Sequence, residues 1–181
     1  MEYTKKSLRE LGIQELKKIA TSGHKQEKER KLYQKLFQSD EWKHAHVIGL
    51  TISNEIEVAT KPIIEVAWKE KKTVLVPKTG PNRQMKFFQV DGTTKFEKTK
   101  FGVFEPISDR FFAPDNIDLL LVPGLVYHPL GYRIGFGGGY YDRYLANYNN
   151  QTCSLVFQEQ LNDQWVPESF DKKIQQLFID Q

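Results

Sequence analysis

The most constraining feature of this sequence is a glycine-rich segment that follows a short, strongly apolar run. The apolar run is Leu-Leu-Leu-Val at residues 119–122, and Pro123 and Gly124 end it. The glycine-rich segment reads Gly-Tyr-Arg-Ile-Gly-Phe-Gly-Gly-Gly-Tyr-Tyr-Asp-Arg-Tyr at residues 131–144. Because glycine interrupts regular structure and tolerates positive φ, the order predicts a buried strand, a loop and the start of a helix.

The glycines of this segment predict a phosphate site. Successive backbone N–H groups without side chains can approach an anion closely, and a helix that opens near Tyr141 adds the positive end of its dipole. Arg133 and Arg143 bracket the loop and can form paired hydrogen bonds with phosphate oxygens. The alternative is a mobile turn, which needs neither the arginines nor the two tyrosines.

Two common glycine motifs are excluded by their spelling. A Walker loop ends in Gly-Lys-Ser or Gly-Lys-Thr, whereas Tyr140 follows the last glycine here. The dinucleotide fingerprint fits Gly135 and Gly137 but needs a third glycine at the position of Tyr140. Neither a P-loop nor an NAD site is expected.

The order of apolar runs predicts an α/β fold with a largely parallel sheet. The first 40 residues predict two helices, one capped by Thr4 and one starting at Ser22. Because the later strands alternate with helices or loops, a layered fold is expected, with ligands beyond the carboxyl ends of the strands. The expected strands are residues 46–52, 73–77, 85–90, 117–122 and 153–157, and a further helix is expected at residues 62–71.

Composition favours one domain, residues 1–181, that works inside the cell. The chain lacks any run of about 18 apolar residues, and its first six residues lack the apolar stretch of a signal peptide. A cytoplasmic protein without membrane contact is therefore expected. The single cysteine, Cys153, excludes an internal disulfide and lies in a run typical of a buried strand.

The charge distribution favours an anionic ligand. The net charge is +3, and most of the excess lies between Lys5 and Lys35. A nucleotide, a polyglutamate tail and nucleic acid are all compatible with this excess. Nucleic acid is the weaker option, because the chain has neither Arg-Gly-Gly repeats nor ribonucleoprotein aromatic motifs.

Four charged residues outside the loop core are candidates for ligand contacts. Lys5 and Arg9 are four apart, so a helix places both on one face, which is either a phosphate contact or a solvated basic face. Asp142 is either a Mg²⁺ ligand beside phosphate or a carboxylate favoured by the helix dipole. Glu57, just beyond the strand at residues 46–52, is either a ligand contact or a solvated side chain near a turn.

Taken together, these motifs resemble the 5-formyltetrahydrofolate cyclo-ligase family, also called 5,10-methenyltetrahydrofolate synthetases. The resemblance spans nearly the whole chain and is most specific in its last block. The matching segments are residues 5–9, Ser53 with residues 57–60, residues 101–106 and residues 118–144.

The resemblance implies a three-layer α/β/α sandwich, similar to the ribose-phosphate isomerase and CoA-transferase fold. It also implies an enzyme that uses ATP and Mg²⁺ to convert 5-formyltetrahydrofolate into 5,10-methenyltetrahydrofolate, ADP and phosphate. The formyl oxygen attacks the γ-phosphate, N10 attacks the activated carbon, and phosphate leaves as the ring closes. Such chemistry needs positioning and charge neutralisation rather than a covalent nucleophile. The expected partners are small molecules, with or without a polyglutamate tail on the folate, and the expected state is a monomer.

The resemblance also implies roles for individual residues. The catalytic set is Arg133, Tyr140 and Asp142, and the metal ligands are Asp142 and Asp171. The ATP-binding set is Lys5, Arg9, Arg133, Ile134, Gly135, Phe136, Gly137, Gly138, Gly139, Tyr140 and Tyr141. The substrate-binding set is Ile52, Glu57, Phe136, Gly137, Gly138, Gly139 and Tyr140.

The sequence departs from the family pattern at two positions. His128 stands where the family usually has aspartate, and Gly138 stands where some members carry lysine. Two competing functions remain open from the residues alone. A sugar-phosphate isomerase or CoA-transferase-like enzyme of the same fold would turn over without ATP. A nucleic-acid-binding module would bind through its basic helices with strong salt dependence, and would leave the glycine loop without a role.

Overall fold

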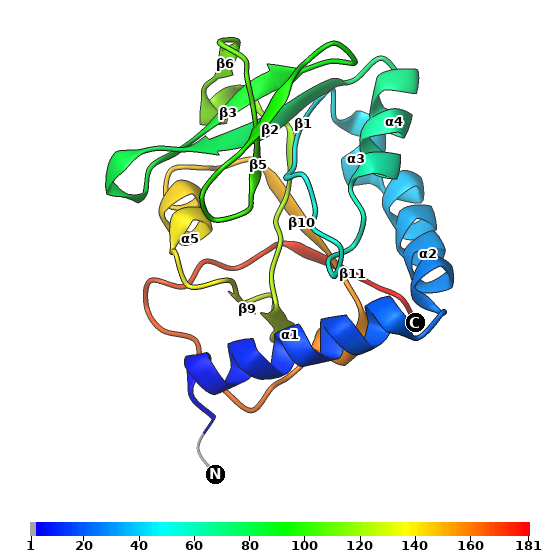
Figure 1. Cartoon of the computed structure of the whole chain (residues 1–181), viewed down its shortest axis with the longest axis vertical. Helices are drawn as coiled ribbons and strands as arrows, with labels where there is room; N and C mark the ends of the chain where they lie inside the picture. Colours follow the sequence, from blue (N-terminus) through cyan, green and yellow to red (C-terminus); the bar gives the residue numbers. More distant parts are fainter. Residues whose placement is uncertain (1–2) are drawn as a thin grey trace.

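The computed structural model describes residues 3–181 and contains a central sheet with helices packed on both faces (Figure 1). The helices are α1 (Lys5–Thr21), α2 (Lys25–Gln38), α3 (Asp40–His44), α4 (Lys61–Lys69) and α5 (Tyr140–Leu145), with short 3-10 turns η1 (Pro81–Arg83), η2 (Pro114–Asn116) and η3 (Gln158–Gln160). The strands are β1 (Val47–Gly49), β2 (Thr73–Thr79), β3 (Met85–Val90), β4 (Phe96–Lys98), β5 (Phe104–Pro106), β6 (Phe111–Phe112), β7 (Leu119–Leu121), β8 (Val126–Tyr127), β9 (Arg133–Ile134), β10 (Gln151–Val156) and β11 (Gln176–Ile179).

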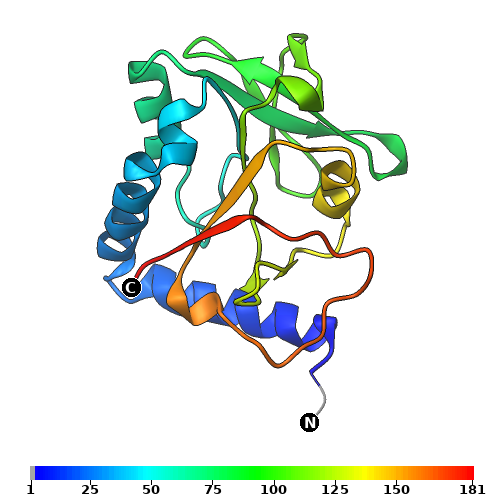
Figure 2. The same ribbon diagram turned by 180° about the vertical axis from the view of Figure 1, so that it is seen from behind.

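The described residues form a seven-stranded main sheet in the order β11-β10-β7-β1-β2-β3-β6. The five strands from β11 to β2 are parallel to one another, and β3 and β6 continue the sheet antiparallel. Figure 2 shows β10 and β11 side by side from behind. The prediction of a largely parallel sheet is confirmed.

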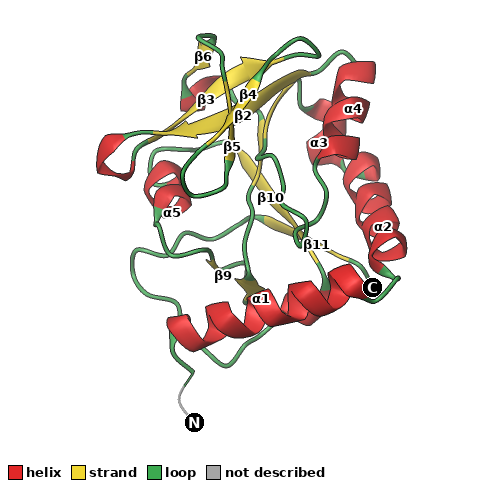
Figure 3. Ribbon diagram, viewed as in Figure 1, coloured by secondary structure: helices red, strands yellow, loops and turns green. Residues whose placement is uncertain are grey.

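Alternating side chains divide the core into two apolar clusters, one on each face of the sheet. On β2, Val74 and Val76 belong to one cluster and Leu75 to the other, as the period of two along a strand requires. The first cluster includes buried residues of α2, α3 and α4, whereas the second includes Leu145 of α5 and the following Tyr148. The resulting layers, which Figure 3 shows by element type, form the expected three-layer α/β/α arrangement.

Helix α1 lies across the carboxyl edge of the parallel strands (Figure 1). Its buried positions include Leu8, Gly12 and Leu16, which recur every four residues along one face. A Cβ atom at Gly12 would lie 2.8 Å from the carbonyl oxygen of Leu125, just beyond β7. Glycine therefore lets α1 pack closely against the segment that leaves the sheet.

The two N-terminal helices are confirmed, although the start of the second was predicted wrongly. Thr4 caps α1 as expected and shares a capping box with Ser7. Ser22 does not start α2. Its hydroxyl donates to the carbonyl of Ile19 at 2.8 Å and so ends α1. The chain then turns at Gly23, which has φ 77°, and α2 begins at Lys25.

The predicted strands and the helix at residues 62–71 all exist, but several have different bounds. Strand β1 has three residues instead of the seven predicted at 46–52, because the chain leaves the sheet after Gly49. Helix α3, the hairpin of β4 and β5, strands β6, β8 and β9, and the C-terminal strand β11 were not predicted. Cys153 is fully buried in the first cluster, as expected. None of the helices described here is long and apolar enough to cross a membrane.

Candidate functional site

The glycine loop between β9 and α5 has the backbone that its sequence predicts. Gly137 and Gly139 have φ values of 103° and 72°, which a residue with a Cβ rarely adopts. A Cβ atom at Gly135 would lie 2.8 Å from Nη1 of Arg133. The loop therefore needs glycine both for its conformation and for the close approach of an arginine.

Arg9 of α1 holds this loop from the N-terminal side of the chain. Its Nε donates a hydrogen bond to the carbonyl oxygen of Gly135 at 3.0 Å. A Cβ atom at Gly137 would lie 3.4 Å from the Arg9 Cζ and Nε atoms. The helix that crosses the carboxyl edge thus brings a guanidinium against two loop glycines, and the basic face of α1 is not wholly solvated.

Arg133 is a buried cation under the same loop. Only 5% of the residue is exposed, and its Nε lacks a hydrogen-bond partner among the described residues. Its Nη2 lies 3.8 Å from Oδ1 of Asp142, and its Cζ lies 5.4 Å from the centre of the Tyr141 ring. Burial raises the pKa of the Tyr141 hydroxyl, which also lacks a partner within residues 3–181. Buried donors without partners are uncommon and mark a place where a polar ligand can bind.

A cleft opens at the carboxyl edge of the sheet, with an internal volume of about 60 Å³ that becomes about 520 Å³ when its open mouth is included. Its walls come from the ends of β1, β7 and β10, from α1 through Leu16, and from the segment that carries Glu57. Glu57 Oε2 accepts a hydrogen bond from the backbone N–H of Asn54 at 2.8 Å. Burial raises the pKa of Glu57, while that hydrogen bond and the charge of Lys25 lower it by less.

Tyr127 connects the cleft with the glycine loop. This buried residue lines the cleft and lies opposite Arg133 in the β8–β9 pair. Burial raises the pKa of Tyr127 to about 12, with a smaller lowering by Arg133 and a smaller raising by Glu57. Because Tyr127 both lines the cleft and pairs with Arg133, the cleft adjoins the strand that leads into the glycine loop.

The two predicted metal ligands have different environments. Asp142 Oδ1 accepts the backbone N–H of Lys172 at 3.2 Å, and its Oδ2 has no hydrogen-bond partner within residues 3–181. The side chain of Asp171 is 4% exposed and pairs with Lys5 at 2.9 Å. It also accepts the backbone N–H of Glu168 at 2.7 Å. Over the described chain, no group of three or more acidic, histidine or cysteine side chains is arranged to hold a metal.

Lys5, predicted to bind ATP, is held by carboxylates in this structure. It forms ion pairs with Asp171 and with Glu168. Burial alone would lower the pKa of Lys5, but the hydrogen bonds and charges of the two carboxylates outweigh it and raise the pKa. Lys5 and Asp171, predicted as a phosphate contact and a metal ligand, are thus partners of each other here.

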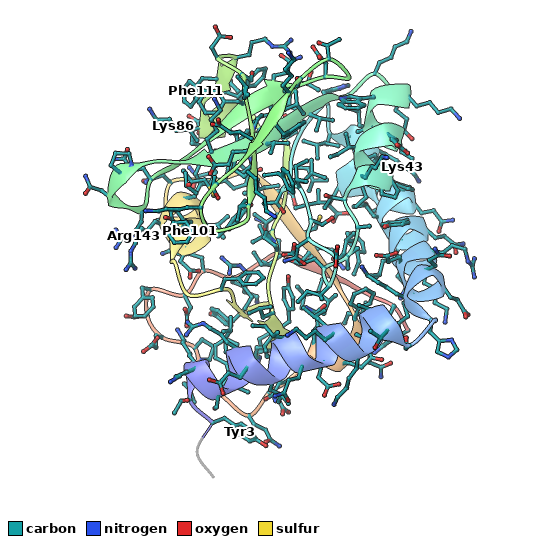
Figure 4. All side chains as sticks on the ribbon, viewed as in Figure 1. Tyr3, Lys43, Lys86, Phe101, Phe111 and Arg143 are labelled. Carbon is teal, nitrogen blue, oxygen red and sulfur yellow. The ribbon has the colours of Figure 1, made fainter. Side chains whose placement is uncertain are left out.

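The remaining candidates are spread around the loop and the cleft. Phe136 is 56% exposed at the loop surface, and Tyr140 begins α5. Ile52 packs against the first apolar cluster between two cleft-lining residues without lining the cleft itself. Arg143 is exposed on α5 and points outward in Figure 4, unlike the buried Arg133.

His128, which departs from the family pattern, has a local role. Its Nδ1 accepts the backbone N–H of Leu130 at 3.1 Å, as an aspartate side chain does in an Asx turn. The imidazole ring also meets the edge of Trp165, with ring centres 5.8 Å apart. The substitution therefore leaves the turn between β8 and β9 intact.

Two residues near the site were missed from the sequence. Tyr127 gave no signal beyond its apolar surroundings. Arg83 follows Gly-Pro-Asn, a typical turn signal, but nothing in the sequence placed that turn beside the glycine loop. In the structure, Arg83 Nη1 lies 3.9 Å from the position that a Cβ atom on Gly139 would occupy.

The chain as a whole has counterparts in known proteins. The model of the 5-formyltetrahydrofolate cyclo-ligase family matches residues 2–179. The 5-formyltetrahydrofolate cyclo-ligase of Haemophilus influenzae is 28% identical over 166 residues, which are 88% of this chain and 89% of that protein. A probable 5-formyltetrahydrofolate cyclo-ligase of Schizosaccharomyces pombe is 36% identical over 120 residues, covering 61% of this chain and 56% of that protein.

Solved structures agree at the level of the fold. The 5,10-methenyltetrahydrofolate synthetase of Aquifex aeolicus superposes with a TM-score of 0.85 at 23% identity, over 97% of this chain and 89% of that chain. The 5,10-methenyltetrahydrofolate synthetase of Mycoplasma pneumoniae superposes with a TM-score of 0.76 at 23% identity, over 99% of this chain and 100% of that chain.

The layered fold and the nearly complete match define the chain as an enzyme of the cyclo-ligase class. It belongs to the 5-formyltetrahydrofolate cyclo-ligase family.

Proposed function

We propose that this protein catalyses the ATP- and Mg²⁺-dependent closure of 5-formyltetrahydrofolate to 5,10-methenyltetrahydrofolate, with release of ADP and phosphate. The observation that carries the proposal is the junction of two features at the carboxyl edge. One is the cleft that contains Glu57, and the other is the glycine loop held by Arg9 and resting on the buried Arg133. The first suits a polar heterocycle and the second suits a phosphate chain.

The loop and its arginines bind and orient the nucleotide in this proposal. Backbone N–H groups between Gly135 and Tyr140 approach the phosphates, and Arg133 supplies a positive charge shielded from water. A buried guanidinium with an unpaired Nε stabilises the charge that develops during phosphoryl transfer, because it needs no reorientation. Lys5 can bind the phosphates only if its ion pairs with Glu168 and Asp171 break.

The residues present fit a magnesium ion bound together with the nucleotide. Mg²⁺ typically takes one or two carboxylates, phosphate oxygens and water, and Asp142 offers an oxygen without a partner in the described chain. When bound, the ion neutralises phosphate charge. Asp171 binds Lys5 and the backbone N–H of Glu168. It thereby holds the segment that leads to Lys172, whose N–H binds Asp142.

The cleft holds and orients the folate. Glu57 accepts hydrogen bonds from N–H groups of the heterocycle, and its burial makes those bonds strong. Phe136 and Tyr140 cover the ring from the loop side, where aromatic stacking contributes on the order of 1 kcal/mol per pair. The formyl oxygen then faces the γ-phosphate, and N10 closes the ring once that oxygen is phosphorylated. The enzyme acts as a cytoplasmic monomer on folates with or without a polyglutamate tail.

The test is the absorbance of the methenyl product after mixing the purified full chain with 5-formyltetrahydrofolate, Mg²⁺ and ATP. The expected result is a rise that requires both ATP and Mg²⁺ and that releases one phosphate per product. An equal rise without ATP, or no rise from a folded protein that binds ATP, overturns the proposal. Asp142→Asn should raise the Mg²⁺ concentration needed for half-maximal rate by about tenfold or more, with an unchanged melting temperature.

A further inference from the structure

A hairpin far from the glycine loop in sequence brings a third arginine against it. Strands β2 and β3 are joined by residues 80–84, and the 3-10 turn η1 forms the tip of this hairpin. Arg83 Nη1 lies 3.9 Å from the position of a Cβ on Gly139, the last glycine before α5. In Figure 1 the connection between β2 and β3 projects on the same side of the molecule as α5.

The three arginines approach different parts of the loop from different elements. Arg9 comes from α1 and binds the carbonyl of Gly135, and Arg133 comes from β9 and lies under Gly135. Arg83 comes from the hairpin and lies beside Gly139. A phosphate chain along this loop would therefore meet guanidinium groups near both of its ends.

The Arg83 guanidinium is available for an external partner. Within residues 3–181, no carboxylate pairs with it and no oxygen accepts a hydrogen bond from it, whereas Arg110 and Arg133 each have an acidic neighbour. Arg83 is exposed, so this free charge costs little in water. A guanidinium that is not used internally can form paired hydrogen bonds with phosphate oxygens.

The backbone of the hairpin tip is shaped in an unfavourable way. Asn82 and Arg83 have φ values of 58° and 57°, in the left-handed region that residues with a Cβ seldom adopt. Asparagine tolerates this region, but arginine gains nothing from it. Asn82 and Arg83 are the central residues of the turn that the Gln84 N–H closes onto the Pro81 carbonyl at 3.3 Å, and type I′ hairpin turns have positive φ at both central positions. The turn type therefore accounts for this backbone.

We infer that Arg83 is a nucleotide-binding residue that contacts the phosphate chain at the Gly139 end of the loop. This inference rests on the proposed use of ATP and adds a contact to it. The basis is the position of a free guanidinium from a separate hairpin beside a glycine backbone already approached by two other arginines. Variants of Arg83 are expected to fold, because its side chain is exposed and makes no hydrogen bond within residues 3–181.

The experiment compares equilibrium binding of Mg·ATP and steady-state kinetics in four variants of the full chain. Arg83→Ala should weaken ATP binding and raise the KM for ATP by about tenfold or more. Its KM for 5-formyltetrahydrofolate should stay within about twofold of the wild type. Arg83→Lys should recover part of the loss, since lysine keeps the charge but not the fork. Lys86→Ala, which removes one exposed charge from β3 of the same hairpin, is the matched control and should change ATP binding by less than about twofold.

Arg83→Gly separates a functional role from a structural one. Glycine adopts positive φ without a Cβ penalty, so this variant should be at least as stable to urea as the Arg83→Ala variant while losing ATP affinity to the same extent. Unchanged ATP binding in Arg83→Ala, or an equal loss in Lys86→Ala, overturns the assignment of Arg83 and leaves the proposed function intact. Failure of the wild-type chain to bind Mg·ATP overturns both.

Discussion

The amino edge of the main sheet and the glycine loop near its carboxyl edge differ in how their buried polar groups are satisfied. The hollow at the amino edge has about 840 Å³, open solvent included, and is lined by residues of α3 and by Asp118, Asn149, Asn150 and Gln151. The cleft at the carboxyl edge has about 520 Å³ on the same basis. By size alone, the hollow at the amino edge would be the first candidate for a ligand.

At the amino edge the polar side chains bind the protein itself. Asp118 accepts hydrogen bonds from the backbone N–H groups of His46 and Val47, both at 2.8 Å. Asn150 donates to the carbonyl of Ile117 at 2.8 Å. No buried side-chain atom that lines this hollow lacks a partner within the described chain. These hydrogen bonds stabilise the chain where β1 and β7 begin, so the polar residues here have a structural role.

Beside the glycine loop, two buried polar groups lack an internal partner. Arg133 Nε and the Tyr141 hydroxyl have no hydrogen-bond partner in the described chain, and the same is true of Trp68 on α4 and of Tyr144, which packs against Phe87 and Tyr148. A buried polar group without a partner destabilises the folded state, and a bound ligand that supplied the missing hydrogen bonds would offset that cost. Because two such groups lie together under the glycine loop, unsatisfied hydrogen bonding favours this region as a binding site more than volume does.

The largest expected effect comes from removing the buried cation at the carboxyl edge. Arg133→Met should lower kcat/KM by about 100-fold or more, because the positive charge beside the phosphates is lost. The fold should survive, since methionine fills a similar volume, and Asp142, which loses its cationic neighbour, is 22% exposed and keeps its hydrogen bond from Lys172. The measurement is the initial rate of methenyl product formation, with the melting temperature taken in parallel. Arg30→Met on the exposed surface of α2 is the control, and equal rates in the two variants would remove Arg133 from the site.

An intermediate effect is expected at the amino edge, on stability alone. Asp118→Ala leaves the N–H groups of His46 and Val47 without their acceptor and should lower the free energy of unfolding by about 1–3 kcal/mol. The rate of product formation at 25 °C should equal that of the wild type. Urea unfolding measures the first quantity, and Asp109→Ala, an exposed carboxylate, should change it by less than about 0.5 kcal/mol. A loss of turnover in folded Asp118→Ala would instead give the amino edge a functional role.

Local sequence patterns predicted the parts of the fold that depend on neighbouring residues. The alternation of strands and helices, the cap at Thr4 and the glycine loop all follow from residues close together in the chain. Strands such as β6, β8 and β9 were missed because two residues are too few to show a period. Ser22 was misread because a serine can end a helix as well as start one, and the outcome depended on its bond to Ile19.

The candidate site was predictable in its residues more than in its contacts. The sequence indicated Arg133, Asp142 and Glu57, and their roles in catalysis, metal binding and folate binding stay predictions. It did not indicate that Lys5 pairs with Asp171, 166 positions away, or that Arg83 reaches Gly139. Such contacts depend on how helix α1 and the β2–β3 hairpin dock, and no local pattern encodes that geometry.

The weakest effect is expected in the cleft, from the ionisation of Glu57. Because burial raises its pKa in the folded state, ionised Glu57 destabilises the fold relative to the protonated form. Below the ordinary glutamate pKa of about 4.5, the carboxyl is protonated in both states and this penalty disappears. The penalty grows as pH rises through the folded-state pKa and is complete at neutral pH.

Glu57→Gln should therefore be more stable than the wild type at pH 7 and equal to it at pH 4, because glutamine resembles the protonated acid and can still accept the Asn54 N–H. Thermal unfolding of both proteins between pH 4 and pH 8 measures the difference, with Glu55→Gln as the exposed neighbour that should show no pH-dependent gain. The same Glu57 variant should bind 5-formyltetrahydrofolate more weakly and Mg·ATP unchanged. A stability gain that is constant with pH would mean that the Glu57 charge is compensated within the cleft. In that case Glu57 would have its hydrogen bonds and charge satisfied within the protein, as the polar groups at the amino edge do.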